Sequence, residues 1–286
     1  MSGQVHRVAV IGAGTMGHGI AQVAAMAGYD VDLLDAATEL ANRGLERIRS
    51  NLDEGIRRQK MTMPERDAAL GRIRAGADMS RCAEADIVIE AVPEKVEVKA
   101  AVFAQVAPYL QDHAILATNT SSLSITQLQE RTPHPDRFIG LHFFNPVHIN
   151  RLVEVVRGRH TSDDTLETSV TFAERIGKDP IVVNDAPGFA TSRLGVLLGL
   201  EAMRMVEEGV ASAADIDKAM ELGYRHPMGP LKLTDLVGLD VRLDIARYLY
   251  DTMHREQFKP PRILEEMVAE GKLGKKTGQG FYTWEV

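Results

Sequence analysis

Residues 5–17 read VHRVAVIGAGTMG, a β-rich apolar run followed by glycines in the spacing G-x-G-x-x-G. The run predicts a buried strand, and the next segment, Thr15–Ala27, predicts a helix. In this context Gly12 permits a tight turn, Gly14 lets the backbone approach a pyrophosphate, and Gly17 lets helix and strand pack closely. The N–H groups at the helix start favour phosphates. The residues predicted to bind a dinucleotide are Gly12, Ala13, Gly14, Thr15, Met16 and Gly17.

A carboxylate in the next strand indicates which dinucleotide is bound. Asp35 ends the strand expected at Asp30–Asp35, 18 residues after Gly17. A carboxylate there accepts hydrogen bonds from both ribose hydroxyls and repels a 2′-phosphate. Because two alanines and no arginine follow Asp35, the residues predict NAD rather than NADP. FAD, which uses the same turn, is the competing ligand, and a glycine turn that serves only the fold is the structural alternative.

Strand-like runs alternate with helical stretches through the first two thirds of the chain. This alternation predicts a parallel sheet with helices on both faces. The expected helices are Val96–Leu110 and Thr165–Ile176. The further expected strands are Asp86–Glu90, Ala114–Ala117, Arg137–Phe143, Leu152–Val156 and Pro180–Val183.

Two parts of the chain depart from the alternation. Residues 38–74, approximately, form a charged stretch that predicts two inserted helices. After Ala186 a Pro-Gly pair ends the strand signals, and only helical patterns follow. We therefore expect an α/β Rossmann dinucleotide-binding domain in residues 1–186, with a helical insertion at about 38–74, followed by an all-α C-terminal domain in residues 187–286.

Composition excludes several classes of protein. The 286 residues carry a net charge of −7, and this acidic balance argues against a nucleic-acid-binding protein. The uncharged stretch Val8–Tyr29 resembles a membrane span, but its five glycines make it a poor apolar helix. The single cysteine, Cys82, fits a reducing cytoplasm. The histidines His18, His148 and His226 lack metal-ligand spacing, so no metal site is expected.

A histidine and a glutamate in two apolar strand-like runs form a candidate catalytic pair. His142 and Glu154 lie 12 residues apart on either side of the turn signal Asn145-Pro146. Two neighbouring strands would bring imidazole and carboxylate within hydrogen-bond distance. Oxidation of an alcohol by NAD⁺ needs a base for the hydroxyl proton, and histidine has a suitable pKa. The alternative is a strand histidine that is merely a satisfied polar group.

From Val8 onward the chain resembles the short-chain L-3-hydroxyacyl-CoA dehydrogenase family, in its 3-hydroxybutyryl-CoA dehydrogenase branch. The motifs that carry the resemblance follow the family order. They are Gly12–Gly17, Glu90–Glu94, Asn119–Leu123, His142–Pro146, Pro187–Phe189 and Gly274–Tyr282.

The resemblance implies a role for individual residues. His142 matches the general base, Glu154 its acidic partner, and Ser121 a serine that bonds the substrate's C3 oxygen near the nicotinamide. The positions that match cofactor contacts are Asp35, Glu94, Lys99, Ser121 and Lys276. Asn51 and Arg58 match contacts to coenzyme A. Ser192 stands where many members carry an active-site asparagine, so its part in substrate binding is left open.

The inserted helices favour a CoA ester on their own, though modestly. Residues 43–74 hold nine Lys/Arg and five Asp/Glu, and Arg47, Asn51 and Arg58 share one helical stripe that could meet the phosphates of CoA. A solvated charged face is an equally good interpretation of this pattern.

The resemblance implies NAD-dependent oxidation of (3S)-3-hydroxyacyl-CoA to 3-oxoacyl-CoA, in fatty-acid β-oxidation or short-chain acyl-CoA metabolism. It also implies a homodimer formed through the helical domain, where several apolar residues crowd more than one side of a helix (Leu194, Val196, Leu197, Leu198 and Leu200). Two alternatives stand beside it: a dehydrogenase of a free hydroxy acid such as gulonate, and a non-catalytic nucleotide-binding relative.

Overall fold

The computed structural model of the chain describes residues 5–285. The chain divides into two compact units between Ala186 and Pro187. Among the described residues, no helix has both the length and the apolar character that a membrane crossing requires.

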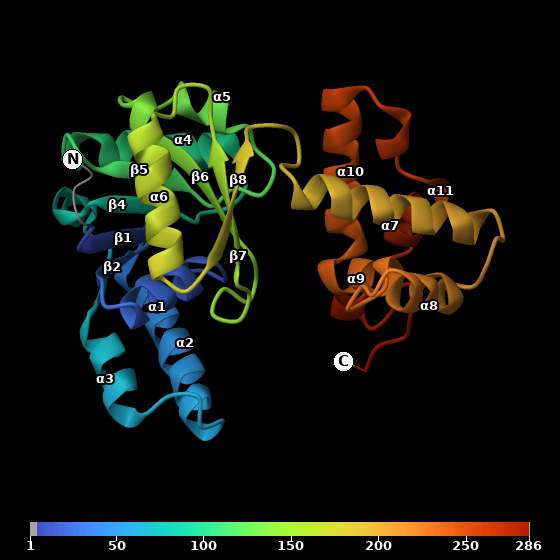
Figure 1. Ribbon diagram of the computed structural model, residues 1–286, viewed down its shortest axis with the longest axis horizontal. Coiled ribbons are helices and arrows are strands. Elements are labelled where there is room, and N and C mark those ends of the chain that lie inside the picture. Colours follow the sequence, from blue (N-terminus) through green and yellow to red (C-terminus); the bar gives the residue numbers. More distant parts are fainter. Residues whose placement is uncertain (1–4, 286) are drawn as a thin grey trace. The chain divides into compact units, whose positions relative to one another are not determined.

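The first unit is built on one eight-stranded sheet in the order β3-β2-β1-β4-β5-β6-β7-β8 (Figure 1). The reversal of strand order beside β1 is the arrangement of a Rossmann fold, which confirms the fold class expected from the sequence. The strands are β1 Arg7–Ile11, β2 Asp30–Leu34, β3 Ile73–Gly76, β4 Ile87–Glu90, β5 Ile115–Thr118, β6 Phe138–Phe143, β7 Leu152–Arg157 and β8 Asp179–Asn184.

Helices cover both faces of this sheet, so its central strands are apolar on both sides. On one face Val8 and Val10 pack with α1 (Gly17–Met26) and α6 (Asp163–Arg175), and the rings of Tyr29 and Phe172 lie 5.4 Å apart. On the other face the rings of Phe103, from α4 (Val96–Val106), and Phe138 meet at 5.2 Å. Shorter helices complete the unit: η1 Met79–Glu84, η2 Ala107–Tyr109, α5 Ile125–Gln129 and η3 Pro135–Arg137.

One strand pair runs against the expected parallel arrangement. The strands β6 and β7 are antiparallel, whereas every other neighbouring pair in the sheet is parallel. The reason is the short connection between them, because a tight turn reverses the chain and only a longer crossover keeps strands parallel. This reversal places His142 directly opposite Glu154 in the register.

The inserted helices are shorter than expected. They are α2, Thr38–Arg57, and α3, Met63–Gly71, which extend away from the sheet as a pair (Figure 1). The prediction that helix continues to Arg74 is wrong, because Ile73–Gly76 forms the edge strand β3 beside β2. This strand has only four residues, too few for the alternation of a half-buried strand to stand out from the helical pattern before it.

The second unit consists of helices around its own apolar core, in which Val196, Leu200, Leu231 and Leu243 are buried. Four of its helices are expected from helical patterns in the sequence, at Arg193–Glu208, Ala213–Leu222, Asp240–Glu256 and Arg262–Glu270. A fifth, α9, was missed, although Pro230 at its start and Gly238 at its end mark it. The helices are α7 Thr191–Glu207, α8 Ala213–Gly223, α9 Pro230–Val237, α10 Leu239–Met253, η4 Glu256–Phe258, α11 Arg262–Ala269 and η5 Lys275–Thr277.

Candidate active site

The glycine turn between β1 and α1 is tight enough to accept a phosphate against bare backbone. Gly12 has φ +96° and a Cβ there would lie 2.7 Å from the Ala91 carbonyl oxygen, while a Cβ on Gly17 would lie 1.6 Å from the Gly12 oxygen. A Cβ on Gly14, by contrast, would meet nothing within 4 Å. Gly12 and Gly17 therefore close the turn, and Gly14 presents an open backbone surface. These features fit the pyrophosphate of a dinucleotide.

Asp35 lies just beyond β2 and is already tied to the glycine turn. Its carboxylate accepts hydrogen bonds from the backbone N–H of Ala13 and of Ala36, both at 2.7 Å. The carboxylate is thus held beside the turn, at the place where a ribose would follow the pyrophosphate. This position fits the role expected for Asp35.

His142 and Glu154 form a buried pair on the neighbouring strands β6 and β7. Nδ1 of His142 lies 2.7 Å from Oε2 of Glu154. The histidine is 7% exposed, the glutamate is fully buried, and the ring of Phe144 lies 4.4 Å from the imidazole. A carboxylate at Nδ1 fixes the tautomer with its proton on that nitrogen, so Nε2 is the basic atom. The arrangement can take a proton from a hydroxyl group and stabilise the resulting imidazolium.

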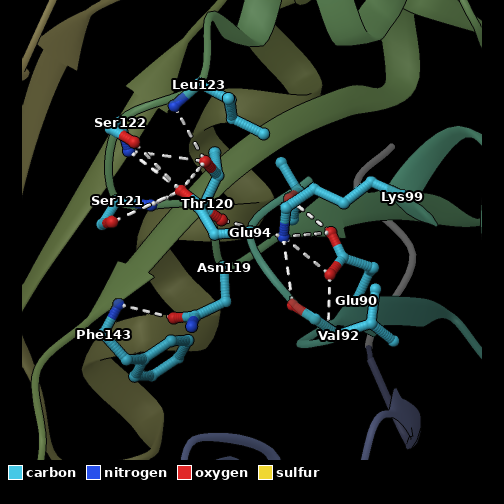
Figure 2. Close-up of polar contacts among 11 residues, drawn as sticks. Glu90, Val92, Glu94, Lys99, Asn119, Thr120, Ser121, Ser122, Leu123 and Phe143 are labelled. Carbon is cyan, nitrogen blue, oxygen red and sulfur yellow. Dashed lines mark hydrogen bonds and ion pairs between the residues drawn. The ribbon is translucent and has the colours of Figure 1, made fainter. Parts of the chain in front are cut away.

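Ser121 lies on the loop after β5, and Glu94 organises that loop (Figure 2). Oε1 of Glu94 accepts hydrogen bonds from the backbone N–H of Ser121 at 2.8 Å and of Ser122 at 3.2 Å, and from the Thr120 hydroxyl at 2.5 Å. The Ser121 hydroxyl itself lies 3.3 Å from the same oxygen, a long contact that leaves the hydroxyl able to turn elsewhere.

Behind Glu94 lies a buried ion pair that sequence reasoning did not single out. Lys99 is 1% exposed, and its Nζ lies 2.8 Å from Oε1 of the fully buried Glu90 and 3.2 Å from Oε2 of Glu94 (Figure 2). Glu90 also accepts a hydrogen bond from the Thr118 hydroxyl at 2.6 Å. One ammonium group therefore joins the end of β4 to the loop that carries Ser121.

The pKa values of the two carboxylates in this cluster, Glu90 and Glu94, are shifted in opposite directions. Burial raises the pKa of Glu90, and the pKa stays above its ordinary value although Lys99 and Thr118 favour the ionised form. Burial also acts to raise the pKa of Glu94, but the charge of Lys99 and the hydrogen bonds from Thr120 and Ser121 outweigh it, so this pKa is lowered. Glu94 is thus the more firmly ionised of the two.

The sheet topology explains why these groups meet. The last residue of β4, Glu90, is in register with Ile11 of β1 and Thr118 of β5, and the parallel strand β6 follows. The carboxyl ends of the parallel strands share one edge, where α/β proteins bind their ligands. Asn119 helps to hold this edge, since its side-chain oxygen accepts a hydrogen bond from the Phe143 N–H at 2.9 Å.

The residues expected to contact CoA lie on or beside α2, where each has a different hydrogen-bond partner. Asn51 donates a hydrogen bond to the side chain of Gln22 on α1 at 3.0 Å. Arg58 follows the last residue of α2 and pairs with Glu54 at 2.6 Å. The exposed Arg47 has no ion-pair partner among residues 5–285, so its positive charge is not neutralised by a neighbouring acid. The charge of Arg58, in contrast, is paired with Glu54.

Two of the expected site residues belong to the second unit. Lys276 lies in η5 and pairs with Asp240, its Nζ being 2.6 Å from each carboxylate oxygen. Ser192 lies in the first turn of α7 and is partly exposed. Sequence reasoning missed Asp240, although a carboxylate in the first turn of a helix is a recognisable signal.

The residues that sequence reasoning missed in the first unit carried a signal of their own. Glu90, Asn119 and Thr120 lie within the quoted motifs, at the ends of apolar strands, where polar residues are expected only if they serve the site.

Within residues 5–285, no three His, Cys, Asp or Glu side chains are grouped so as to hold a metal ion.

Comparison with known proteins gives matches along the whole chain. Residues 7–186 match the family model described as 3-hydroxyacyl-CoA dehydrogenase, NAD binding domain, and residues 188–284 match the model described as 3-hydroxyacyl-CoA dehydrogenase, C-terminal domain. The chain is 42% identical over 284 residues to a 3-hydroxybutyryl-CoA dehydrogenase of Bradyrhizobium diazoefficiens, covering 99% of this chain and 97% of the relative.

Two further relatives extend this likeness. A probable 3-hydroxybutyryl-CoA dehydrogenase of Deinococcus radiodurans is 43% identical over 276 residues, which are 96% of this chain and 99% of the relative. The crystal structure of (S)-3-hydroxybutyryl-CoA dehydrogenase PaaH1 from Ralstonia eutropha matches with a TM-score of 0.96 at 40% identity, covering 99% of this chain and all of that one.

Proposed function

The chain belongs to the 3-hydroxyacyl-CoA dehydrogenase family, and from this membership we infer that it is an NAD-dependent oxidoreductase. It oxidises (3S)-3-hydroxybutyryl-CoA, with NAD⁺ as acceptor, to 3-oxobutyryl-CoA, NADH and a proton. The observation that carries the assignment of the reaction to named residues is the 2.7 Å contact between His142 and Glu154 at the strand edge that bears the glycine turn.

We propose that His142 is the general base. Nε2 removes the proton from the C3 hydroxyl, and the buried carboxylate of Glu154 stabilises the imidazolium that forms. When bound, NAD⁺ supplies the acceptor for the hydride that leaves C3. Ser121 orients the C3 oxygen through its hydroxyl group, which the loop held by Glu94 presents at the same edge of the sheet.

We propose further roles for the residues around this centre. Gly12–Gly17 and Asp35 hold the pyrophosphate and ribose, while Glu94 and Lys276 contact the cofactor. Lys99 acts at the cofactor site through Glu94, since it is 1% exposed and enclosed by carboxylates. For the substrate, we propose Asn51 and Arg58 as contacts to CoA and Ser192 as a contact to the acyl part.

A substrate comparison tests the proposed function. NADH formation is measured with (3S)-3-hydroxybutyryl-CoA, with free 3-hydroxybutyrate and with gulonate. We expect turnover of the CoA ester alone. Activity confined to the free acids would assign the protein to the other substrate class, and NAD binding without turnover of any of the three would make it a non-catalytic relative.

Asp35 is expected to set the choice between NAD and NADP. Replacing Asp35 with serine removes a charge that repels a 2′-phosphate, and two unit charges at 4 Å interact with about 1–4 kcal/mol near a protein surface. We therefore expect the ratio of kcat/KM for NAD over NADP to fall about tenfold or more. Steady-state kinetics with both cofactors measure this ratio, and an unaltered enzyme that already favours NADP would contradict the assignment.

We also propose a cytoplasmic homodimer. NAD and acyl-CoA are intracellular compounds, which supports the location. The helix α7 supports the dimer, because Val196 and Leu200 are buried in the core of the unit while Leu194 is 60% and Leu198 42% exposed on other sides of it. An apolar strip of this kind on a protein surface is typical of an interface.

Leu198→Arg tests the dimer, because a buried charge at an apolar interface is costly. We expect the unaltered protein to have the mass of a dimer and the variant that of a monomer, as measured by size-exclusion chromatography with light scattering. Met63→Arg, at an exposed methionine of α3, is the matched control and should stay dimeric. An unaltered protein of monomer mass would refute the proposal.

A further inference from the structure

Asp185 lies directly after β8, and its carboxylate binds a segment that comes about 60 residues earlier in the chain. Oδ2 accepts hydrogen bonds from the Ser124 hydroxyl at 2.8 Å and from the Thr126 N–H at 2.9 Å. Oδ1 accepts a third hydrogen bond, from the Ile125 N–H at 3.1 Å. Both carboxylate oxygens are thus used at the start of α5, which follows the loop that carries Ser121.

The short helix α5 depends on this carboxylate. A helix leaves its first N–H groups without a partner inside the helix, and α5 has only five residues. Asp185 accepts hydrogen bonds from the first two of these N–H groups. The Ser124 hydroxyl oxygen accepts one from the third, the N–H of Gln127, at 3.2 Å. Because the same hydroxyl donates to Asp185, all three N–H groups rely on Asp185, directly or through Ser124.

Asp185 is itself fixed to the sheet. Its N–H donates a hydrogen bond to the Arg157 carbonyl oxygen at 2.8 Å. This bond continues the parallel pairing of β7 with β8, in which Arg157 and Asn184 are the last partners. The position of the carboxylate is therefore set by β7, the strand that carries Glu154.

The loop that carries Ser121 is consequently held by two carboxylates from other parts of the chain. Glu94, after β4, accepts hydrogen bonds from the N–H groups of Ser121 and Ser122 (Figure 2). Asp185 holds the end of the loop through Ser124. The Ser121 hydroxyl makes only a long contact of 3.3 Å with Glu94, so its direction depends on the course of the backbone that the two carboxylates define.

We propose that Asp185 is a positioning residue for Ser121 in the oxidation reaction. The carboxylate fixes the start of α5 and with it the end of the preceding loop, so that the Ser121 hydroxyl is held where it meets the C3 oxygen. This inference rests on the proposed function, in which Ser121 orients that oxygen. In this role Asp185 touches neither substrate nor cofactor, and its effect on the rate passes through Ser121.

The test is a double-variant cycle that combines Asp185→Ala with Ser121→Ala. We expect Asp185→Ala to lower kcat with (3S)-3-hydroxybutyryl-CoA by about 5- to 30-fold, the factor that corresponds to the loss of a helix cap when all of it is felt at the site. In the Ser121→Ala enzyme the same change should lower kcat by less than about twofold, because the group that Asp185 positions is already absent. A residue that served only the fold would slow both enzymes by the same factor.

The fold should survive this change, because packing also anchors α5. Ile125 is fully buried, and a Cβ on Gly140 of β6 would lie 2.7 Å from its side chain. Ser124→Ala is a milder second variant that removes one of the three hydrogen bonds to Asp185. It should lower kcat by about two- to fivefold, again only in the enzyme that keeps Ser121.

Asp185→Asn is the conservative variant. Asparagine caps helices about as well as aspartate does, so this enzyme should keep kcat within about threefold of the unaltered value. An enzyme with asparagine that is as slow as the one with alanine would contradict the capping role.

Asp78 offers a matched control. Its carboxylate caps η1 in a similar way, accepting hydrogen bonds from the Ser80 N–H at 3.0 Å and from the Ser80 hydroxyl at 2.6 Å. None of the candidate site residues lies in η1. Asp78→Ala should lower the melting temperature, as Asp185→Ala does, but leave kcat unchanged. If it slows the reaction equally, loss of stability explains both results and the inference is refuted.

The outcomes separate this inference from the proposed function. If Asp185→Ala leaves kcat unchanged, or slows the Ser121→Ala enzyme as much as the unaltered one, the positioning role is refuted while the dehydrogenase assignment stands. If Ser121→Ala itself has no effect on kcat, the proposed role of Ser121 fails, and that of Asp185 fails with it. If no CoA ester is oxidised by the unaltered enzyme, the proposed function itself fails.

Discussion

We expect the replacement of His142 by alanine to lower kcat with 3-hydroxybutyryl-CoA by about 10²- to 10⁴-fold, the usual contribution of a positioned general base. The dissociation constant for NAD should hardly change, because the glycine turn follows β1 and Asp35 follows β2, whereas His142 lies on β6. Steady-state kinetics measure kcat, and titration calorimetry with NAD measures the dissociation constant. A rate close to that of the unaltered enzyme would remove His142 from the mechanism.

Glu154→Gln is the companion variant, because it keeps the shape of the side chain and removes its charge. It should also impair catalysis, since the imidazolium loses its stabilising carboxylate and the amide can favour the other tautomer of His142. If the rate stays normal, the carboxylate does not act on the imidazole during the reaction, whatever the distance between them.

The second large effect is expected at Lys99, and it concerns stability. Lys99→Met leaves the fully buried carboxylate of Glu90 without its counter-charge, and breaking a buried pair on one side costs about 3–5 kcal/mol. Urea denaturation at neutral pH measures the loss of unfolding free energy. Because Lys99 also holds Glu94, we expect kcat to fall as well, through a less ordered Ser121 loop.

The pH dependence of this loss identifies its cause. The pKa of Glu90 is already raised in the folded protein, and removal of Lys99 raises it further. A raised folded-state pKa stabilises the fold at low pH and loses that contribution as pH rises through it. The difference from the unaltered protein should therefore narrow as pH falls from about 8 to about 5, within the range known for buried carboxyl groups. A constant difference would show that packing, not charge, is lost.

The double variant Glu90→Gln with Lys99→Met is the control. Replacing both members of a buried ion pair by neutral groups is often nearly neutral for stability. We expect it to recover a large part of the free energy that Lys99→Met loses. If the double variant is less stable than either single variant, the two residues do not act as a pair.

The Rossmann architecture could be predicted from sequence because its signals are local. A strand, a glycine turn and a helix occur in one continuous stretch, and the central strands are apolar throughout since both faces of the sheet are covered. The edge strand β3 could not be predicted, because its pairing with β2 is a tertiary contact that leaves little trace in four residues. The antiparallel run of β7 likewise depends on how the chain turns back.

Within the candidate site too, contacts between neighbouring segments could be predicted from the sequence, and contacts that depend on tertiary packing could not. The proximity of His142 and Glu154 could be expected from two apolar runs around a turn, and the structure brings the pair together; the catalytic roles stay predictions. The Glu90–Lys99–Glu94 cluster could not be derived, because it joins a strand end, a loop and a helix whose packing fixes the distances. For Lys99 the family correspondence names a cofactor contact, whereas its burial indicates an indirect role.

The antiparallel pairing of β6 and β7 has a consequence for how this enzyme tolerates change. The imidazole and the carboxylate face each other because residues 142 and 154 are cross-strand neighbours, so the register of the two strands sets their contact. Changes in the loop between the strands should preserve the pair as long as Val147 stays in the core and Lys178 keeps its bonds to the carbonyls of Val147 and Asn150. A slip of the ladder by a single position would instead turn one member toward the opposite side of the sheet. Insertions are therefore best tolerated at the exposed residues of this loop, where they leave the register of the two strands unchanged.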